Sequence, residues 1–311
     1  MSSVRKPNPV VALAVGDLHL CHHRPSARAD EDWYWVMENY LRQLDSLQKE
    51  LDVPILCAGD IFDKWNSPPE LINFAIDYLP FMYTIPGQHD LPYHGYDRME
   101  SSAYWTLVQA GVINDLYVDE PRYFDQSEYS LCIHGIPWGM EPKKADIKDE
   151  ALHIALVHAF IWKKDKGYPG APEDSLVSRW KKKLQGYDVA IFGDNHQAFT
   201  VGSSPPTIHN CGTFIRRHQN EIDERPSVGL IHLDGSITRE YFDTSIDIFA
   251  DRREEWQGTS TDGLDDFLES LDELDLESID FPSQLRKAVE EPGVRKEVRD
   301  LLLKVLDGIC E

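Results

Sequence analysis

One pattern recurs along the 311 residues and constrains the fold more than any other feature. An unbroken apolar run ends in glycine and is followed by side chains that can bind a metal ion. The first copy is residues 10–15, followed by Gly16, Asp17 and His19. A run of this kind is typical of a strand buried on both faces. One copy alone would better suit a polar loop, so the argument depends on the repeats.

The pattern returns three more times. The apolar runs are residues 54–58, 81–86 and 189–192, and the residues after them are Gly59 to Asp63, Gly87 to Asp90 and Gly193 to His196. A fifth run, residues 154–157, ends in His158 without a glycine. His134, between Ile133 and Gly135, is a second candidate for this strand-end position.

Helical spacing of apolar residues alternates with these strands in the first half of the chain. It predicts helices over residues 30–51, 67–79 and 101–110, with Asp30 or Asp32 as a cap for the first. Alternating strands and helices predict an α/β fold with a largely parallel sheet. Short strands follow residue 112, with one helix at 176–184 and a hairpin turn at Asp234-Gly235.

Parallel strands place their carboxyl ends at one edge of a sheet, so the polar residues after them can converge. These residues are Asp17, His19, Asp60, Gln88, His89, His158, Asp194 and His196. Carboxylate, imidazole and amide ligands without cysteine suit manganese, iron, magnesium or zinc. The set exceeds the needs of one ion. The sequence therefore predicts two divalent ions about 3.5–4 Å apart, bridged by one carboxylate.

The composition limits the functions open to the chain. The formal net charge is −23, which argues against binding nucleic acid through phosphate contacts alone. Part of this charge is local, because residues 262–280 contain nine acidic and no basic residues, but the remainder is still acidic.

The cysteines and the apolar runs indicate the cellular compartment. The five cysteines are scattered without a C-x-x-C pair, which argues against a disulfide framework and a zinc ribbon. Cys57 and Cys132 lie in apolar runs and are expected to be small buried hydrophobic residues. No apolar stretch approaches the roughly 20 residues that span a bilayer, and no signal peptide is evident. A cytoplasmic location is therefore expected.

The ordered motifs from Gly16 to His196 resemble those of the calcineurin-like metallophosphoesterases, over about residues 10–245. The resemblance implies a four-layer α/β/β/α sandwich with two metal ions. The implied ligands are Asp17, His19 and His196 for the first ion, Gln88, His158 and Asp194 for the second, and Asp60 as the bridge. His89 is implied to face the scissile phosphate, and Asp90 to orient His89.

Two positions depart from the family pattern, and both fall on the second ion. Gln88 stands where the family has asparagine, and Asp194 where it has histidine. An added carboxylate favours manganese or magnesium over zinc. The same change is compatible with a selective site and with a site that has lost activity.

Within the family the chain is most similar to the SbcD-type DNA repair nucleases. The similarity lies in Asp17 to Leu20, in Gly59 to Asp63, and in the closing segments 193–197, 210–217 and 228–235. It implies phosphodiester hydrolysis of DNA by a dimetal-activated hydroxide. Arg216 and Arg217 are expected either to meet the phosphate backbone or to be surface charges without a role.

Three parts of the chain are expected: a catalytic domain over residues 1–245, an acidic linker with an amphipathic stripe over 246–281, and C-terminal helices over 282–311. In the SbcD-type enzymes the C-terminal helices bind the coiled coil of an SbcC-type ATPase. The stripe from Val294 to Val305 is a candidate for the same contact, or for packing against the catalytic domain. DNA, such an ATPase and a second copy of the chain are the expected partners, and a membrane is not.

Two other classes of function remain open. A phosphatase or phosphodiesterase acting on a nucleotide, a small molecule or a phosphoprotein is easier to reconcile with the acidity. A non-catalytic, metal-bound scaffold is consistent with Asp194 and the acidic tail.

Overall fold

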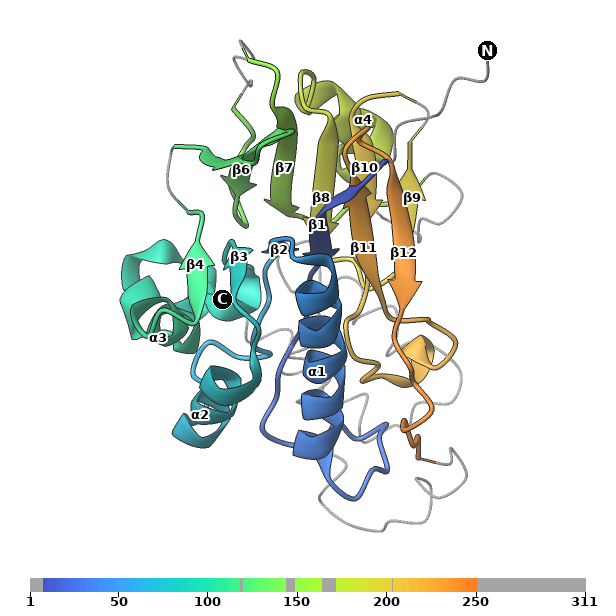
Figure 1. The fold of residues 1–311 in the computed structure, drawn as a ribbon. Helices are drawn as coiled ribbons and strands as arrows, with labels where there is room; N and C mark the ends of the chain where they lie inside the picture. The colour runs from blue at the N-terminus through green and yellow to red at the C-terminus, as the bar shows by residue number, and fades with distance from the viewer. Residues whose placement is uncertain (1–7, 118–119, 144–148, 164–171, 203, 251–311) are drawn as a thin grey trace, which may run out of the picture. The chain divides into compact units, whose positions relative to one another are not determined.

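The computed structural model describes residues 8–117, 120–143, 149–163, 172–202 and 204–250. All of them except Pro172 belong to one compact unit. The unit contains two six-stranded sheets, and Figure 1 shows their strands and the helices α1 to α4. None of the described helices is both long and apolar enough to cross a membrane.

The first sheet has the order β12-β11-β1-β2-β3-β4. Its strands are β1 (Val10–Val15), β2 (Ile55–Cys57), β3 (Met82–Thr84), β4 (Ile113–Asp115), β11 (Ser227–His232) and β12 (Ile237–Tyr241). The strands β1 to β4 are mutually parallel, while β11 runs antiparallel to β1 and to β12. This confirms the predicted parallel core of the first half of the chain.

The second sheet has the order β5-β6-β7-β8-β10-β9. Its strands are β5 (Arg122–Asp125), β6 (Ser130–Ile136), β7 (Leu152–His158), β8 (Val189–Gly193), β9 (Phe199–Val201) and β10 (Thr207–Asn210). The four central strands are parallel, and the two edge strands are antiparallel to their neighbours. Each sheet therefore has one edge at which its parallel strands end.

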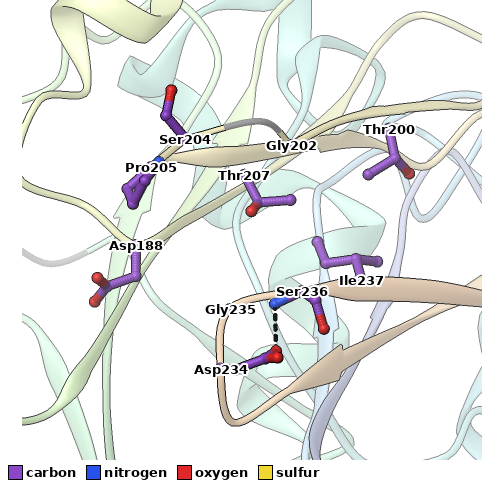
Figure 2. A pocket seen from close by; sticks show the side chains of 10 residues that line it. All are labelled: Asp188, Thr200, Gly202, Ser204, Pro205, Thr207, Asp234, Gly235, Ser236 and Ile237. Atoms are coloured by element: carbon purple, nitrogen blue, oxygen red, sulfur yellow. Dashed lines mark hydrogen bonds between the residues drawn. The ribbon is translucent and has the colours of Figure 1, made fainter.

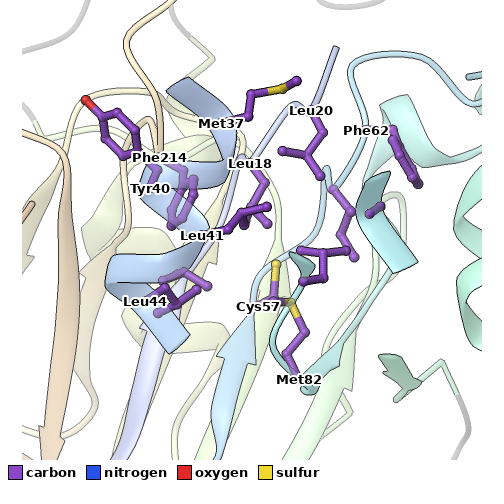
Figure 3. Packing of buried hydrophobic residues seen from close by; sticks show 14 of the residues in the cluster. Leu18, Leu20, Met37, Tyr40, Leu41, Leu44, Cys57, Phe62, Met82 and Phe214 are labelled. Atoms are coloured by element: carbon purple, nitrogen blue, oxygen red, sulfur yellow. The ribbon is translucent and has the colours of Figure 1, made fainter. Parts of the chain in front are cut away.

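Helices cover the outer faces of both sheets. The helices are α1 (Trp33–Leu51), α2 (Pro69–Tyr78), α3 (Ala103–Gln109) and α4 (Val177–Lys183). Figure 3 shows side chains of α1, among them Met37, Leu41 and Leu44, packed near Cys57 and Met82 of the first sheet. On the second sheet, Trp180 of α4 packs against Phe192.

A separate core lies between the two sheets. It joins Val11 and Leu56 of the first sheet to Ile154, Leu156 and Ile191 of the second. Together with the two helix-covered faces, this core gives four layers in the order helix, sheet, sheet, helix. The predicted α/β/β/α sandwich is confirmed.

Short 3-10 turns connect several elements: η1 (Gln88–Asp90), η2 (Pro92–His94), η3 (Tyr96–Ser101), η4 (Glu173–Ser175) and η5 (Gln219–Glu221). The start of α1 follows the sequence closely, because the Asp32 side chain accepts a hydrogen bond from the Trp35 amide at 3.0 Å. The alternative cap, Asp30, is instead paired with the buried Arg28.

The compact unit extends to Ala250, five residues past the boundary expected from the sequence. The side chain of Asp247 is buried there and accepts hydrogen bonds from Arg28, Tyr40 and Arg216. The segment 246–250 is therefore part of the folded unit and not of a linker. The rest of the predicted linker and the C-terminal helices lie outside the described residues.

Candidate metal centre

The predicted ligands follow the strand ends of both sheets. Asp17 and His19 follow β1, Asp60 follows β2, Gln88 and His89 lie in the turn after β3, His158 ends β7, and Asp194 and His196 follow β8. The structure brings these residues together where the carboxyl ends of the parallel strands meet. Most of them are buried, and His89, Asp194 and His196 are partly exposed.

The backbone at these positions is unusual. The left-handed region of φ, which residues other than glycine seldom adopt, is occupied by four of the candidate ligands. Their φ values are 52° for Asp17, 42° for His19, 54° for Asp60 and 85° for Asp194. Such strained residues concentrate at functional sites, where the surrounding structure holds them in place. Because four such residues lie at one edge of the sheets, their backbone conformation is a feature of the site that directs the side chains toward one another.

Two of the glycines in the repeated motif leave space for these side chains. A Cβ atom on Gly87 would lie 2.1 Å from Asp60 Oδ1 and 2.6 Å from His158 Cε1. A Cβ atom on Gly59, which has a φ of +95°, would lie 2.5 Å from His158 Nδ1. These two glycines are therefore needed for the close approach of the ligands and not only for a turn.

The first ligand group contains Asp17, His19 and His196. Their candidate ligand atoms lie within 4.8 Å of one another. The Nε2 atoms of His19 and His196 face each other at 3.2 Å. That distance is close to the separation of two nitrogens that bind one ion at about 2.0–2.1 Å.

Asp60 lies at the centre of the site. Its Oδ2 atom is 3.7 Å from His19 Nε2 and 3.4 Å from His158 Nε2. This oxygen is buried and has no hydrogen-bond partner, whereas Oδ1 accepts the His89 amide at 3.0 Å. An unpaired buried carboxylate oxygen between ligands of two groups is the position that a bridging carboxylate requires.

The second group contains Gln88, His158 and Asp194. Gln88 Oε1 is 2.7 Å from His158 Nε2, and Gln88 Nε2 donates to Asp194 Oδ1 at 2.7 Å. The other ring nitrogen of His158 donates to the carbonyl of Ala58. This hydrogen bond fixes the ring so that Nε2 points into the site.

Burial and opposite charges shift the pKa values of the site strongly. Burial raises the pKa of Asp17 to about 6, and burial lowers the pKa of His19 to about 3. Burial would also lower the pKa of His158, but Asp60 raises it to about 10. The nearby histidines overcome the burial of Asp60 and hold its pKa below the usual range. Asp60 therefore stays ionised although it is buried, and its negative charge stabilises positive charge nearby.

The calcineurin-like phosphoesterase profile matches residues 11–198, which is more than half of the chain. The chain belongs to the calcineurin-like phosphoesterase family. No curated protein matches the sequence.

Solved structures to which the chain is similar include an archaeal phosphodiesterase, a Staphylococcus aureus protein described as a 5′-nucleotidase, and a metallophosphoesterase from Sphaerobacter thermophilus. Their sequence identities are 10%, 13% and 14%, and their TM-scores are 0.37, 0.46 and 0.36. The matches cover 74%, 84% and 75% of this chain, and 99%, 58% and 88% of those chains.

The residues present fit the two-metal centre of the calcineurin-like family. The unpaired Asp60 Oδ2 and the facing His19 and His196 nitrogens are what a pair of cations would engage. The donors are oxygen and nitrogen atoms, which suits hard and borderline divalent ions.

The two departures from the family pattern contact each other. Gln88 Nε2 donates to Asp194, and Gln88 Oε1 faces His158. The longer glutamine side chain reaches both neighbours, so one departure accommodates the other. This pairing orients the carboxylate and the amide oxygen together beside the buried imidazole.

The role predicted for Asp90 is wrong. Its carboxylate accepts backbone amides of Ile61, Phe62 and Gly87, at 3.1, 3.2 and 3.0 Å. The ring of His89 is instead held by its Nδ1 atom, which is 2.8 Å from the carbonyl oxygen of Asp63. Asp90 thus clamps the loops after β2 and β3 together and acts on the site through their backbone.

Arg216 and Arg217 are both engaged inside the protein. The Arg216 guanidinium bonds Asp247 and the carbonyl of Ile222. Arg217 is only 5% exposed and bonds Asp63. These contacts give both residues a structural role and leave the predicted phosphate contact without support.

Sequence reasoning missed Glu221, which lies in η5 and is 3% exposed. Its Oε1 atom is 2.9 Å from His196 Nδ1, and its Oε2 atom accepts the amides of Arg217 and His218. Burial opposes ionisation of this carboxyl, but His196 lowers its pKa to about 2. A carboxylate behind a ligating histidine orients the ring toward the ion. No periodic or strand-end signal marks Glu221 in the sequence.

Of the two rival histidines, His158 lies in the centre and His134 lies elsewhere, near Cys132 and His153.

A surface hollow of about 390 Å³ is also separate from the centre (Figure 2). It is bordered by Asp188 before β8 and Thr207 at the start of β10. It therefore lies at the edge where the parallel strands begin, opposite the ligands.

Proposed function

We propose that this chain hydrolyses phosphodiester bonds in nucleic acid, with DNA as its substrate, at the centre built around Asp60. The observation that supports hydrolysis is the buried Asp60 Oδ2 atom, which has no hydrogen-bond partner and lies between the two ligand groups. Manganese is the favoured ion, because Gln88 and Asp194 both offer oxygen to the second group.

Two divalent cations bound there would polarise the phosphate and lower the pKa of a bound water. His89 is the group best placed to act on the substrate. Its Nδ1 atom is fixed by the carbonyl of Asp63, which leaves Nε2 for the substrate. Burial would lower the pKa of His89, but Asp60 and Asp63 raise it overall. A protonated His89 can donate to a phosphate oxygen or to the leaving oxygen.

A pair of aromatic side chains, one of them exposed, follows two of the strand ends that carry the site and supports a substrate with bases. Trp65 lies on the loop that carries Asp60, and Tyr93 follows His89 by four residues. Their ring centroids are 5.6 Å apart, and Tyr93 is 75% exposed. Aromatic rings of this kind stack on bases, a contact worth about 1–3 kcal/mol per base.

A nucleotide or other small phosphoester is the second candidate substrate. It is favoured by the net charge of −23 and by the internal engagement of Arg216 and Arg217. A basic surface strengthens DNA binding, and we propose that an SbcC-like ATPase bound to residues 282–311, where the sequence predicts helices, adds such a surface to the activity of this chain.

The test is digestion of end-labelled single- and double-stranded DNA with Mn²⁺, Mg²⁺ or EDTA, beside hydrolysis of bis-p-nitrophenyl phosphate. We expect metal-dependent cutting that is lost in His89→Ala and kept in His232→Ala, a control at the opposite edge of the first sheet. Tyr93→Ala should raise the KM for DNA about 5- to 160-fold without changing hydrolysis of the small ester.

Two outcomes would contradict the proposal at different levels. Hydrolysis of the small ester with intact DNA would favour the second candidate. Turnover of neither substrate with any of the metal ions, by the unaltered chain or by His89→Ala, would favour a non-catalytic scaffold.

A further inference from the structure

A second cluster of metal-binding side chains lies on the second sheet. Cys132 and His134 are two residues apart on β6, so both point to the same face. His153 on β7 is the register partner of Cys132. Neighbouring strands thus bring a thiol and two imidazoles together.

The three candidate ligand atoms converge on one point. Cys132 Sγ is 3.2 Å from His134 Nε2, and His134 Nε2 is 3.3 Å from His153 Nδ1. All three atoms lie within 4.8 Å of one another. A tetrahedral zinc ion with Zn–N of about 2.0–2.1 Å and Zn–S of about 2.3 Å separates its ligand atoms by about 3.4–3.6 Å. The cluster needs only small shifts to reach that geometry.

The surroundings hold the two imidazoles in position. His153 Nε2 is 2.8 Å from Asp149 Oδ1, so the ring donates there and presents the Nδ1 lone pair to the cluster. Asp149 is in turn bonded by the Tyr123 hydroxyl at 3.1 Å. The ring of His134 packs edge-on against Tyr187, with centroids 5.0 Å apart. A carboxylate behind a ligating histidine is the usual outer arrangement of zinc sites.

This cluster is separate from the centre around Asp60. His153 and His158 both lie on β7, five residues apart, which is about 17 Å along a strand. The odd spacing also places them on opposite faces of the sheet. Among the candidate ligand groups of the described residues, this is the only one with a cysteine.

We propose that Cys132, His134 and His153 bind one zinc ion, with water as the fourth ligand. A thiolate and two imidazoles favour zinc over the harder ions suited to the Asp60 centre. Binding releases the thiol proton of Cys132 to solvent. Asp149 is about 43% exposed, which gives the ion a path from the surface. The bound ion ties β6 to β7 near the edge of the second sheet.

The experiment is titration of the EDTA-treated full chain with Co²⁺, followed by absorption. A cobalt–thiolate bond gives a near-ultraviolet charge-transfer band, which oxygen and nitrogen ligands alone do not give. We expect this band in the unaltered chain and in Asp60→Asn, and its loss in Cys132→Ser. Total zinc per chain should fall by one equivalent in Cys132→Ser.

Cys57→Ala, which alters a buried cysteine of the first sheet, is the matched control and should keep the band. If the unaltered chain gives no thiolate band and its zinc content equals that of Cys132→Ser, the proposal is wrong. The cluster is then a hydrogen-bonded chain from Asp149 to Cys132. Because Asp60→Asn removes only the other centre, this result is independent of the proposed hydrolase.

Discussion

At the scale of single residues, Glu221 shows how a ligand depends on the side chain behind it. Glu221→Gln replaces the carboxylate that is hydrogen-bonded to His196 Nδ1 with a neutral amide. We expect metal affinity, and hydrolysis that depends on it, to fall about 10- to 100-fold. Manganese binding measured by calorimetry checks this. Glu224→Gln, three residues away and only half-buried, should bind manganese normally. Equal affinity in both variants would mean that Glu221 does not orient the ligand.

The residues also show what a sequence can and cannot reveal about a site. The convergence of the candidate ligands was predictable because the carboxyl ends of parallel strands meet, whatever the details of the loops. The roles of Asp90, Arg216 and Glu221 were not. Each depends on which backbone amide or carboxylate lies nearby in space, such as the Gly87 amide or Asp247. Loop conformation sets these contacts, and it leaves no periodic signal.

Another residue-scale effect concerns pH. His209 is fully buried, with Nδ1 2.9 Å from Thr200 Oγ1 and Nε2 unpaired. Burial, with Arg239 adding, lowers its pKa to about 3, against 6.5 when unfolded. Between these values the unfolded state binds the extra proton, so stability is highest above pH 6.5 and falls as the pH drops toward 3.

His209→Leu should therefore lose less stability on acidification than the unaltered chain. Between pH 7 and pH 5 the difference is about 2 kcal/mol, measured by urea unfolding. Parallel pH profiles for the unaltered chain and His209→Leu would contradict the assignment.

At the scale of elements, the glycine between a strand and its candidate ligands can be changed so that metal binding is affected and the fold is not. Gly87 has a φ of −91°, which alanine adopts readily, so only the space near Asp60 and His158 forbids a side chain. We expect Gly87→Ala to reduce manganese affinity at least 10-fold while the far-ultraviolet circular dichroism is kept. Gly95→Ala is the control, because its Cβ would meet nothing closer than 3.8 Å. Unchanged metal binding in Gly87→Ala would show that Asp60 and His158 can move aside.

The elements themselves followed the sequence closely. The helix α1 was predictable because burial of one face gives apolar residues a period of about 3.6 residues. The central strands of the first sheet were predictable because burial on both faces leaves an unbroken apolar run. Several strands are shorter than their apolar runs, as with β3, which covers Met82–Thr84 within the apolar run of residues 81–86. The apolar run continues into the loop because residues there, such as Ile85, are buried between the sheets.

At the scale of the whole molecule, a buried ionic network fastens residues 246–250 to the rest of the unit. Asp247 accepts hydrogen bonds from Arg28, Arg216 and Tyr40, and Arg28 also pairs with Asp30. The charged residues come from segments far apart in the chain, so polar composition alone placed this segment in a linker. Their joint burial is a property of the fold.

The same network gives the largest predicted change in stability. Asp247→Asn leaves two arginines without their shared carboxylate, and the loss of one partner of a buried pair costs about 3–5 kcal/mol. Urea unfolding measures this. Asp45→Asn breaks an exposed pair with Lys49 and should cost at most about 0.5 kcal/mol. If both variants lost equally little, the segment would be held by the packing of Phe249 on Arg28 and not by charge. Because Arg216 joins this network and Arg217 bonds Asp63, Asp247→Asn should also weaken manganese binding, which links the end of the unit to its centre.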